Sequence, residues 1–253
     1  MQMTGKEDSV IKLCGKVAMA LVESGADLDQ AEALATLVGK ISHTDIVCQV
    51  DFYAIYVYLN KTSKMMVFTP RHNRDDLSKV TAIKDLIENS NHSDVSFKEF
   101  NQQITELLRS GNTLPLIPRL LGFGLTSLAV VLFFNVTIPD VIVTVVVSLL
   151  LFILQLWLSN GNMSQYIQNT ISVFCVSFLV LGLTKLGIAN DSFKIIIGAC
   201  LPLLPVVSIV NFVREVFKRR GASIERAMDV VMLLGSQYMG LLVATIFAHT
   251  IGW

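Results

Sequence analysis

Five apolar stretches, each close to the length of a membrane-spanning helix, follow residue 116 of the chain. The hydrocarbon core of a bilayer is about 30 Å thick, and roughly 20 mostly apolar helical residues cross it. Because the stretches are continuous rather than alternating, they predict helices and exclude the strands of a membrane barrel. We therefore expect an α-helical integral membrane protein with five transmembrane helices. The expected spans are Leu120–Ile138, Val141–Leu158, approximately Ile167–Leu183, Ile195–Val213 and approximately Val230–Trp253.

Charged residues divide the chain into two parts. Residues 1–116 carry 12 basic and 15 acidic side chains, whereas residues 117–253 carry 8 basic and 5 acidic ones. This asymmetry predicts a small α+β cytoplasmic domain at 1–116 and a five-helix transmembrane domain at 117–253. The formal net charge of the whole chain is zero. Nucleic-acid binding driven by overall charge is therefore excluded, since it needs an excess of lysine and arginine.

The positive charges of the short loops predict the orientation in the membrane. Cytoplasmic loops carry an excess of lysine and arginine. The loop between the second and third spans is uncharged, and Lys185 and Lys194 flank the next loop. The densest basic segment follows the fourth span and includes Arg214, Lys218 and Arg226. We therefore expect the N-terminal domain to be cytoplasmic and the C-terminus to lie outside.

Periodicity and capping signals in residues 1–116 predict the order helix, helix, strand, strand, helix, helix. The first helix is expected to bury the face formed by Val10, Ile11, Cys14, Val17, Ala18, Leu21 and Val22. The expected elements are a helix over 7–24 ended by Gly25, a helix capped by Asp27 or Asp29 and ended by Gly39, strands over 45–59 and 64–69 joined by a turn at 60–63, a helix from Asp75 to Leu86, and a helix from Ser96 to about Leu108.

No catalytic or cofactor motif is present in the sequence. There is no HExxH, GxSxG or P-loop pattern, and the four cysteines show no CxxC spacing. We therefore expect reduced thiols, no metal, no cofactor and no enzymatic activity. The alternative is a membrane-anchored enzyme or regulatory protein that acts through residues 1–116, with His72 and Asp75 as its first residues to test.

The fourth span contains two prolines, Pro202 and Pro205. Each proline lacks an N–H, so the carbonyls four residues earlier, on Gly198 and Leu201, lose their helical partner. Such breaks are tolerated in a membrane where they are buried in protein or line a water-filled cavity, and they form substrate sites in many transporters. The sequence leaves open whether this break lines a site or is a kink used for packing.

Several polar residues near the membrane boundary are candidates for a substrate or ion pathway. Asn211, Arg214 and Lys218 recur on one helix face, where Arg214 can bind either lipid phosphates or a passing carboxylate. Asp140 and Asp229 are candidate contacts for a proton or a substrate amine, or are plain boundary carboxylates.

Small residues form a stripe along the fifth span at Ser236, Gly240, Ala244 and Ala248. Four-residue spacing places them on one helix face, which allows another helix to approach closely. That helix belongs either to the same chain or to a partner. The sequence favours neither reading.

At these positions the chain resembles the threonine/serine exporter family, specifically its larger split-type subunit. The resemblance rests on Gly25-Ala26 with Glu32, on the stretch 74–80, on Asp140, and most specifically on the fourth span, where Gly198, Pro202 and Pro205 precede Asn211 and Arg214. The chain departs from the family pattern at Val206, where glycine is usual, at Glu215, where aspartate is frequent, and at residues 135–138, where glycines are expected.

The resemblance implies a cytoplasmic α/β domain before five spans, with five further spans supplied by a smaller membrane subunit. It implies a subunit of a secondary transporter in the bacterial inner membrane, which exports a threonine- or serine-like amino acid or a small carboxylate. The expected partners are the lipid bilayer, that smaller subunit and a small-molecule substrate. The absence of an ATP-binding motif favours the proton gradient as the driving force.

Overall fold

The contacts of the chain divide it into two units, each described by itself below. The computed structural model describes residues 5–60, 65–70, 76–92, 96–109, 115–161, 163–218 and 222–252. Unit 1 consists of Met1–Leu114 and Val210–Arg226, and unit 2 consists of Pro115–Ile209 and Ala227–Trp253. The soluble part predicted from the first 116 residues thus gains a segment from more than 90 residues further along the chain.

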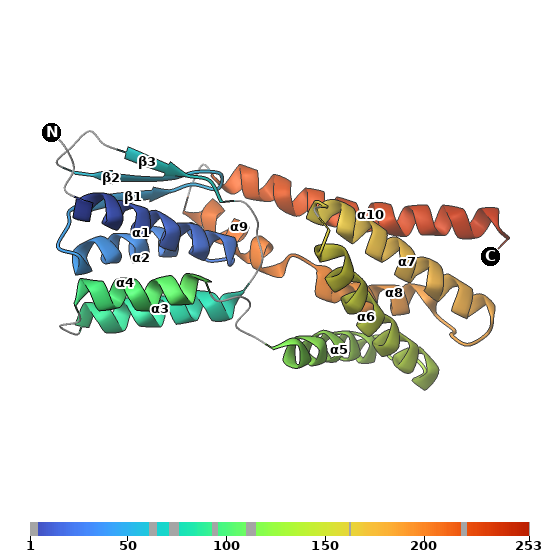
Figure 1. Ribbon diagram of the computed structural model, residues 1–253. Coiled ribbons are helices and arrows are strands. Elements are labelled where there is room, and N and C mark those ends of the chain that lie inside the picture. The colour runs from blue at the N-terminus through green and yellow to red at the C-terminus, as the bar shows by residue number, and fades with distance from the viewer. Residues whose placement is uncertain are drawn as a thin grey trace. The chain divides into compact units, whose positions relative to one another are not determined.

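Unit 1 packs helices against one face of a small antiparallel sheet (Figure 1). The sheet has the order β1-β2-β3, with Cys48 opposite Val57 in the first pair and Val57 opposite Met66 in the second. Helix α1 contacts β2 and β3, and α2 contacts β1. The elements are α1 (Gly5–Glu23), α2 (Leu28–Ile41), β1 (Ile46–Val50), β2 (Ile55–Leu59), β3 (Met65–Phe68), α3 (Leu77–His92) and α4 (Phe97–Arg109).

The core of unit 1 lies between these helices and the sheet. Every residue predicted on the inner face of the first helix is buried, from Val10 to Val22. Alternate residues of β1 and β2 complete the core, because successive side chains of a strand point to opposite faces. The sequence pattern therefore located this core correctly.

Three boundaries predicted in unit 1 were wrong, and one of them is the end of α3, which continues from the predicted Leu86 to His92. Residues 45–59 form two strands rather than one, because the chain turns at 51–54, where the Asp51 side chain accepts a hydrogen bond from the Phe52 N–H at 2.8 Å. Gly39 does not end α2, which continues to Ile41. A Cβ at Gly39 would lie 3.1 Å from the Cβ of Ile46, so its lack of a side chain allows β1 to pass closely.

Gly25 does end the first helix as predicted. Its φ of 88° lies in the left-handed region that glycine adopts at little cost. Asp27 then caps α2 by accepting a hydrogen bond from the Asp29 N–H. In α3, Asp76 accepts the Lys79 N–H at 3.1 Å, whereas Asp75 and residues 61–63 of the predicted turn lie outside the described residues.

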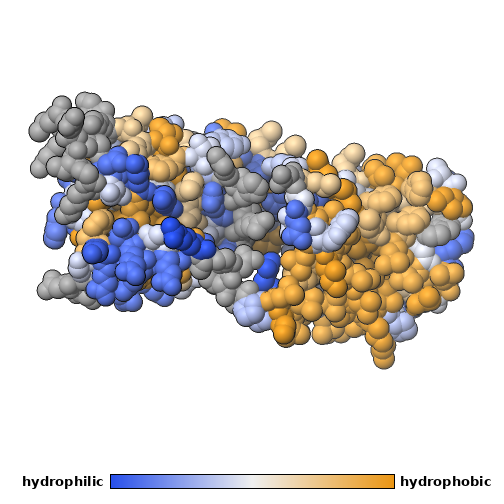
Figure 2. All heavy atoms as spheres, in the orientation of Figure 1, coloured by the Kyte–Doolittle hydropathy of each residue, from blue (hydrophilic) through white to orange (hydrophobic). Residues whose placement is uncertain are grey.

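Unit 2 consists of helices whose outer side chains are apolar, as the orange surface of Figure 2 shows. Four helices are long and apolar enough to cross a membrane, and a bent pair gives a fifth span if it is counted as one. The remaining elements of the chain are α5 (Leu116–Phe133), α6 (Ile138–Ser159), α7 (Gln165–Lys185), α8 (Ser192–Cys200), the 3-10 turn η1 (Leu201–Leu203), α9 (Val206–Phe217) and α10 (Ala222–Thr250).

The first span ends earlier than predicted. Helix α5 stops at Phe133, and Ile138 begins the next helix instead of ending this one. Asn135 adopts a positive φ of 49°, which a continuing helix does not permit. Pro139 then occupies the first turn of α6, where its missing N–H costs nothing.

The fourth apolar stretch is not a continuous helix. It forms α8, the turn η1 and α9, and the two arms of the pair are bent by 65°. Pro202 lies in η1 and Pro205 directly precedes α9, so both prolines sit at the break. Most of α9 belongs to unit 1, which reassigns Asn211 and Arg214 from the predicted membrane domain.

The small-residue stripe of α10 is buried inside the chain. Ala244 and Ala248 are 0% and 3% exposed, and Thr170 of α7 donates a hydrogen bond to the Ser236 carbonyl at 3.0 Å. A Cβ at Gly240 would lie 2.5 Å from the Thr170 carbonyl oxygen. The sequence left open whether the helix at this face comes from the same chain or from a partner. In the structure the face packs against α7 of the same chain.

We predict that Gly240→Ala destabilises unit 2. Its methyl group would meet backbone atoms, so α7 and α10 must separate, at a cost of about 1–3 kcal/mol. Gly235→Ala on the same helix is the matched control, because nothing lies within 4 Å of that position. Thermal unfolding of both variants in detergent measures the difference. Equal stability of the two would contradict the close contact.

Candidate functional site

A buried carboxylate in the first turn of α6 is the centre of the candidate site in unit 2. Asp140 is 1% exposed. Its carboxylate accepts hydrogen bonds of 2.7 Å from the Thr137 hydroxyl and 2.7 Å from the Asn190 N–H. The Asn190 side chain donates in turn to the Thr137 hydroxyl at 2.9 Å. These contacts join the start of α6 to the loop that precedes α8.

The face of α6 below Asp140 is polar. Thr144 and Ser148 follow at four-residue intervals and are each 0% exposed. Both hydroxyls donate to carbonyls of their own helix, on Asp140 and Val145. A line of hydroxyl groups therefore runs from the carboxylate into an otherwise apolar helix. The sequence analysis missed this line, although its spacing of four was visible within the second apolar stretch.

Further polar contacts join the helices of unit 2 farther along α6 and on α10. The Gln155 amide donates to the Asn169 side chain at 3.1 Å and so connects α6 with α7. The Tyr166 hydroxyl donates to Asp229 at 2.7 Å and connects α7 with α10. The Asp229 carboxylate is thus hydrogen-bonded within the chain, and it lies on the helix that corresponds to the predicted fifth span.

One of the two carbonyls freed by the prolines, that of Leu201, is satisfied locally, and a second carbonyl at the break, that of Leu203, binds α10. The Leu201 carbonyl, which has no helical partner because of Pro205, accepts the Leu204 N–H at 2.9 Å. The Leu203 carbonyl accepts the Gln237 amide of α10 at 2.8 Å. Gly198 lies against α5 and α6, where a Cβ would be 2.9 Å from the Thr144 side chain. The break thus lies beside the polar face of α6.

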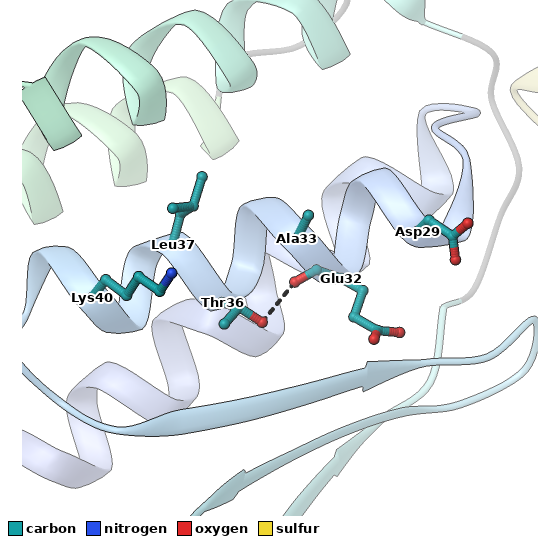
Figure 3. Close-up of a pocket in the computed structure, with 6 residues that line it drawn as sticks. All are labelled: Asp29, Glu32, Ala33, Thr36, Leu37 and Lys40. Carbon is teal, nitrogen blue, oxygen red and sulfur yellow. Dashed lines mark hydrogen bonds between the residues drawn. The ribbon is translucent and has the colours of Figure 1, made fainter.

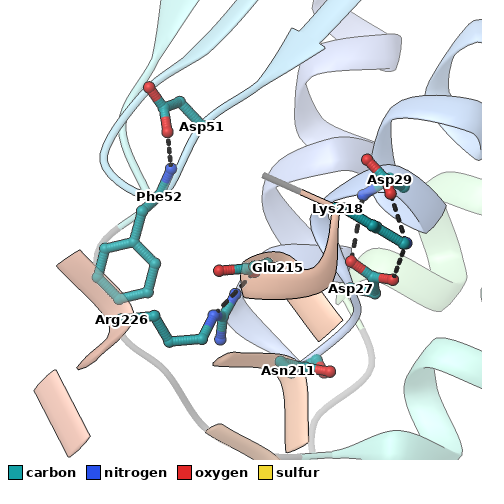
Figure 4. A network of polar contacts seen from close by, with 9 residues as sticks. Asp27, Asp29, Asp51, Phe52, Asn211, Glu215, Lys218 and Arg226 are labelled. Carbon is teal, nitrogen blue, oxygen red and sulfur yellow. Dashed lines mark hydrogen bonds and ion pairs between the residues drawn. The ribbon is translucent and has the colours of Figure 1, made fainter. Parts of the chain in front are cut away.

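A second polar cluster, within unit 1, binds α9 to the loop between α1 and α2 (Figure 4). We call it the α9 clamp, formed by Asn211, Lys218, Gly25, Asp27 and Asp29. Asn211 is 4% exposed and donates to the Gly25 carbonyl at 3.0 Å. Lys218 pairs with Asp27 at 2.9 Å and also with Asp29. Asn211 and Lys218 therefore share one face, as predicted, whereas Arg214 is exposed.

The charges of the α9 clamp stabilise one another. Burial by itself raises the pKa of Asp27, but the hydrogen bond and charge of Lys218 outweigh it and hold that pKa below its ordinary value. Hydrogen bonds to Asp27 and Asp29 raise the pKa of Lys218. The stabilisation is lost only as pH falls through the lowered pKa of Asp27 or rises through the raised pKa of Lys218. It is therefore constant around neutral pH.

A buried ion pair lies next to the α9 clamp. Arg226 donates to Glu215 at 2.9 Å, and the two side chains are 2% and 0% exposed. The guanidinium also lies over the Phe52 ring, 5.1 Å from its centroid, within the range of a cation–π contact. Neither residue was predicted as part of a site, because no local sequence pattern indicates that these two charges are buried together.

The hollow on α2 offers no separate chemistry. It has a volume of about 390 Å³ and is lined by Asp29, Glu32, Ala33, Thr36, Leu37 and Lys40 (Figure 3). Its carboxylates already make structural contacts, since Asp29 pairs with Lys218 and Glu32 accepts the Val50 N–H at 3.4 Å. Among the residues that the structure describes, no group of His, Cys, Asp and Glu side chains could hold a metal ion.

The thiols are free, as predicted for all four cysteines. Burial raises the pKa of Cys48 to about 12 and raises that of Cys14 further, so both remain protonated at neutral pH. His72 and Asp75, the residues of the alternative enzyme reading, lie outside the described residues.

The comparisons with known proteins identify one family. The sequence model described as "Putative threonine/serine exporter" matches residues 12–248 and therefore covers nearly the whole chain. None of the curated proteins and none of the solved structures compared with the chain matches it.

We predict that Arg226→Met destabilises α9 much more than Lys218→Met. The first change leaves the Glu215 carboxylate buried without its cation, which costs about 3–5 kcal/mol. The second removes a pair whose lysine is 43% exposed, and such a pair contributes about 0–1 kcal/mol. Hydrogen exchange of the α9 backbone amides measures both effects. The double variant Glu215→Leu/Arg226→Met should recover most of the loss, and a double variant as unstable as Arg226→Met would contradict the pairing.

Proposed function

Because the chain belongs to the threonine/serine exporter family, we propose that it is a subunit of a secondary transporter that exports a small polar amino acid or a small carboxylate. The members of this family are described as membrane exporters, and the apolar helices of unit 2 agree with a multi-pass membrane protein. The proposal places it in a bacterial inner membrane, with unit 1 cytoplasmic, the C-terminus outside, and the bent pair counted as one span.

The environment of Asp140 is the single observation that supports this function best. A carboxylate inside an apolar helical unit is costly, and such groups commonly mark substrate or proton pathways. The donors to its carboxylate come from Thr137, Asn190 and the Asp191 backbone, and all are neutral. They stabilise the ionised form without neutralising its charge, so the carboxylate can attract the ammonium group of an amino acid. This chemistry favours a threonine- or serine-like substrate over a dicarboxylate.

The proposed pathway continues from Asp140 along the hydroxyl groups of α6. Gly198, Leu201, Pro202 and Pro205 stand beside it at the break, where small rearrangements would free backbone carbonyls for a substrate or ion. Asp229 is proposed as a further polar contact. A role for Asn211 requires its bond to the Gly25 carbonyl to open, whereas Arg214 is exposed and accessible to a carboxylate.

We propose the same carboxylate as the proton carrier; its uptake of a proton requires these hydrogen bonds to open, because they favour the ionised form. A group that alternates between protonated and ionised forms can couple proton entry to substrate exit. The absence of an ATP-binding motif in the sequence leaves an ion gradient as the energy source available to this chain.

We predict that Asp140→Asn abolishes most threonine and serine efflux while the protein still inserts. The amide keeps the size of the carboxylate and an oxygen acceptor, but it can neither take up a proton nor pair with an ammonium group. Asp191→Asn is the matched control. Asp191 caps α8 in the adjoining loop, its side chain is 37% exposed, and it pairs with Lys194 at 3.0 Å.

Efflux from vesicles loaded with labelled amino acid measures both variants, and membrane abundance is measured on the same samples. We expect near-complete loss for Asp140→Asn and near-normal efflux for Asp191→Asn. Normal efflux by Asp140→Asn at normal abundance would exclude the carboxylate from transport. Equal losses in both variants would indicate a structural role for the loop.

We also propose that the chain works with a smaller five-span membrane subunit of the same family. Transporter sites commonly form between two structurally similar halves, and this chain has four candidate spans, or five with the bent pair, in the part that the structure describes. The stripe from Ser236 to Ala248 is filled by α7, so a partner helix would use another face of unit 2, or would displace α7.

We predict that the purified chain alone is inactive in reconstituted vesicles. Efflux of threonine, serine and small dicarboxylates should appear when the small subunit is reconstituted with it, because the second half of the pathway is then present. Robust efflux by the chain alone would show that no partner is needed. Activity with dicarboxylates but not with amino acids would overturn the proposed substrate class.

A further inference from the structure

Helix α9 has two chemically different faces. The face toward unit 1 is polar and buried, with Asn211 4% exposed and Glu215 0% exposed. The opposite face exposes a row of large apolar side chains. Its members are Val206 at 57%, Val210 at 44%, Val213 at 44%, Val216 at 47% and Phe217 at 84% exposure. At about 100° per residue, four of them fall within about 60° of one another.

The rim of this apolar face carries the cation Arg214, whereas Lys218 at the end of the helix is paired with Asp27 and Asp29. Arg214 is exposed, and the side chain of Lys218, directly after the helix, is 43% exposed. Glu215 is the one acidic residue in the sequence of α9, and its carboxylate is buried against Arg226. The exposed surface of α9 therefore combines valines and a phenylalanine with cations and without an exposed carboxylate.

The chain connects α9 directly to the membrane-embedded helices. Only η1 and two residues separate α9 from α8, and the two helices together pass the length and hydropathy criteria of a span. A helix that continues from a membrane span, exposes apolar side chains and is rimmed by arginine and lysine has the composition of an interfacial helix. Water is an unfavourable solvent for five adjacent large apolar side chains.

We propose that α9 is the interfacial arm of the bent span: α8 and η1 enter the bilayer, and the apolar face of α9, Val206 to Phe217, lies in the boundary between headgroups and acyl chains, so that the pair still counts as one crossing. Arg214 then meets the phosphates of anionic lipids, while Asn211 and Lys218 hold the rest of unit 1 through the α9 clamp. The surface is thus a lipid-binding site that tethers the soluble unit to the membrane. This inference is independent of the transported substrate.

Lipid fits this surface better than a second protein does. The exposed row is made almost entirely of valine, whose uniform, featureless shape suits acyl chains, whereas protein interfaces centre on aromatic residues and arginine that fit into pockets. Phe217, the one aromatic member, stands at the end of α9 beside Lys218, where an apolar ring and a cation can bracket the headgroup level.

Site-directed spin labelling of the whole chain in vesicles of phosphatidylethanolamine and phosphatidylglycerol tests the proposal. A label is placed at Val213→Cys in a background of Cys175→Ala and Cys200→Ala, and its accessibility to oxygen and to a water-soluble nickel complex is measured. Glu88→Cys on α3 is the aqueous reference, with a side chain 49% exposed. Leu125→Cys on α5, 62% exposed, is the lipid reference.

We expect the Val213 label to be oxygen-accessible and nickel-protected, at a depth of about 5–10 Å, between those of the two references. Nickel accessibility equal to that of the Glu88 label would place α9 in water and overturn the proposal. Protection from both reagents would show that protein covers the face, which would overturn it in favour of a second copy or the partner subunit. Phe217→Cys repeats the measurement if Val213→Cys does not fold.

Discussion

The absence of two N–H groups, at Pro202 and Pro205, is the constraint on which the arrangement of this chain depends. Within an apolar helical unit water cannot replace a lost helical bond, so every freed carbonyl has to find a partner from the protein. At Leu201 the partner is the Leu204 N–H of a 3-10 turn, and at the same break the Gln237 amide binds the Leu203 carbonyl. Because these bonds need a bent backbone, the stretch after Pro205 leaves the direction of α8.

Most of α9, the arm after the break, belongs to unit 1. Its polar residues then fill positions that the first 114 residues leave incomplete: Asn211 satisfies the Gly25 carbonyl, and Lys218 neutralises Asp27 and Asp29. The buried Glu215–Arg226 pair holds the following turn in the same unit. The apolar face of α9 takes no part in these contacts. A helix with the hydropathy of half a membrane span can therefore also belong to unit 1.

The sequence predicted the parts that depend on local pattern. The buried face of α1, the turn at Gly25 and the long apolar helices follow from periodicity and from glycine's tolerance of positive φ. Prediction from the sequence failed where the contacting residues are distant in the chain. Hydropathy cannot distinguish the valines of α9 from those of a membrane span, and no local pattern indicates that Glu215 pairs with Arg226. The departures from the family pattern are instructive, since Thr137 bonds to Asp140 and Glu215 to Arg226. Whether the predicted pathway residues carry substrate stays a prediction.

The long separation between the partners of the α9 clamp has a consequence for biosynthesis. Asn211 and Gly25 are 186 residues apart, and Lys218 and Asp27 are 191 residues apart. At about 5–20 residues per second, the ribosome completes the first part of unit 1 many seconds before α9 emerges. During that interval Asp27 and Asp29 have no lysine partner from α9, and α5 to α8 must be inserted first. Unit 1 can therefore be completed only after α5 to α8 have been synthesised, so its final packing follows the synthesis of the apolar helices.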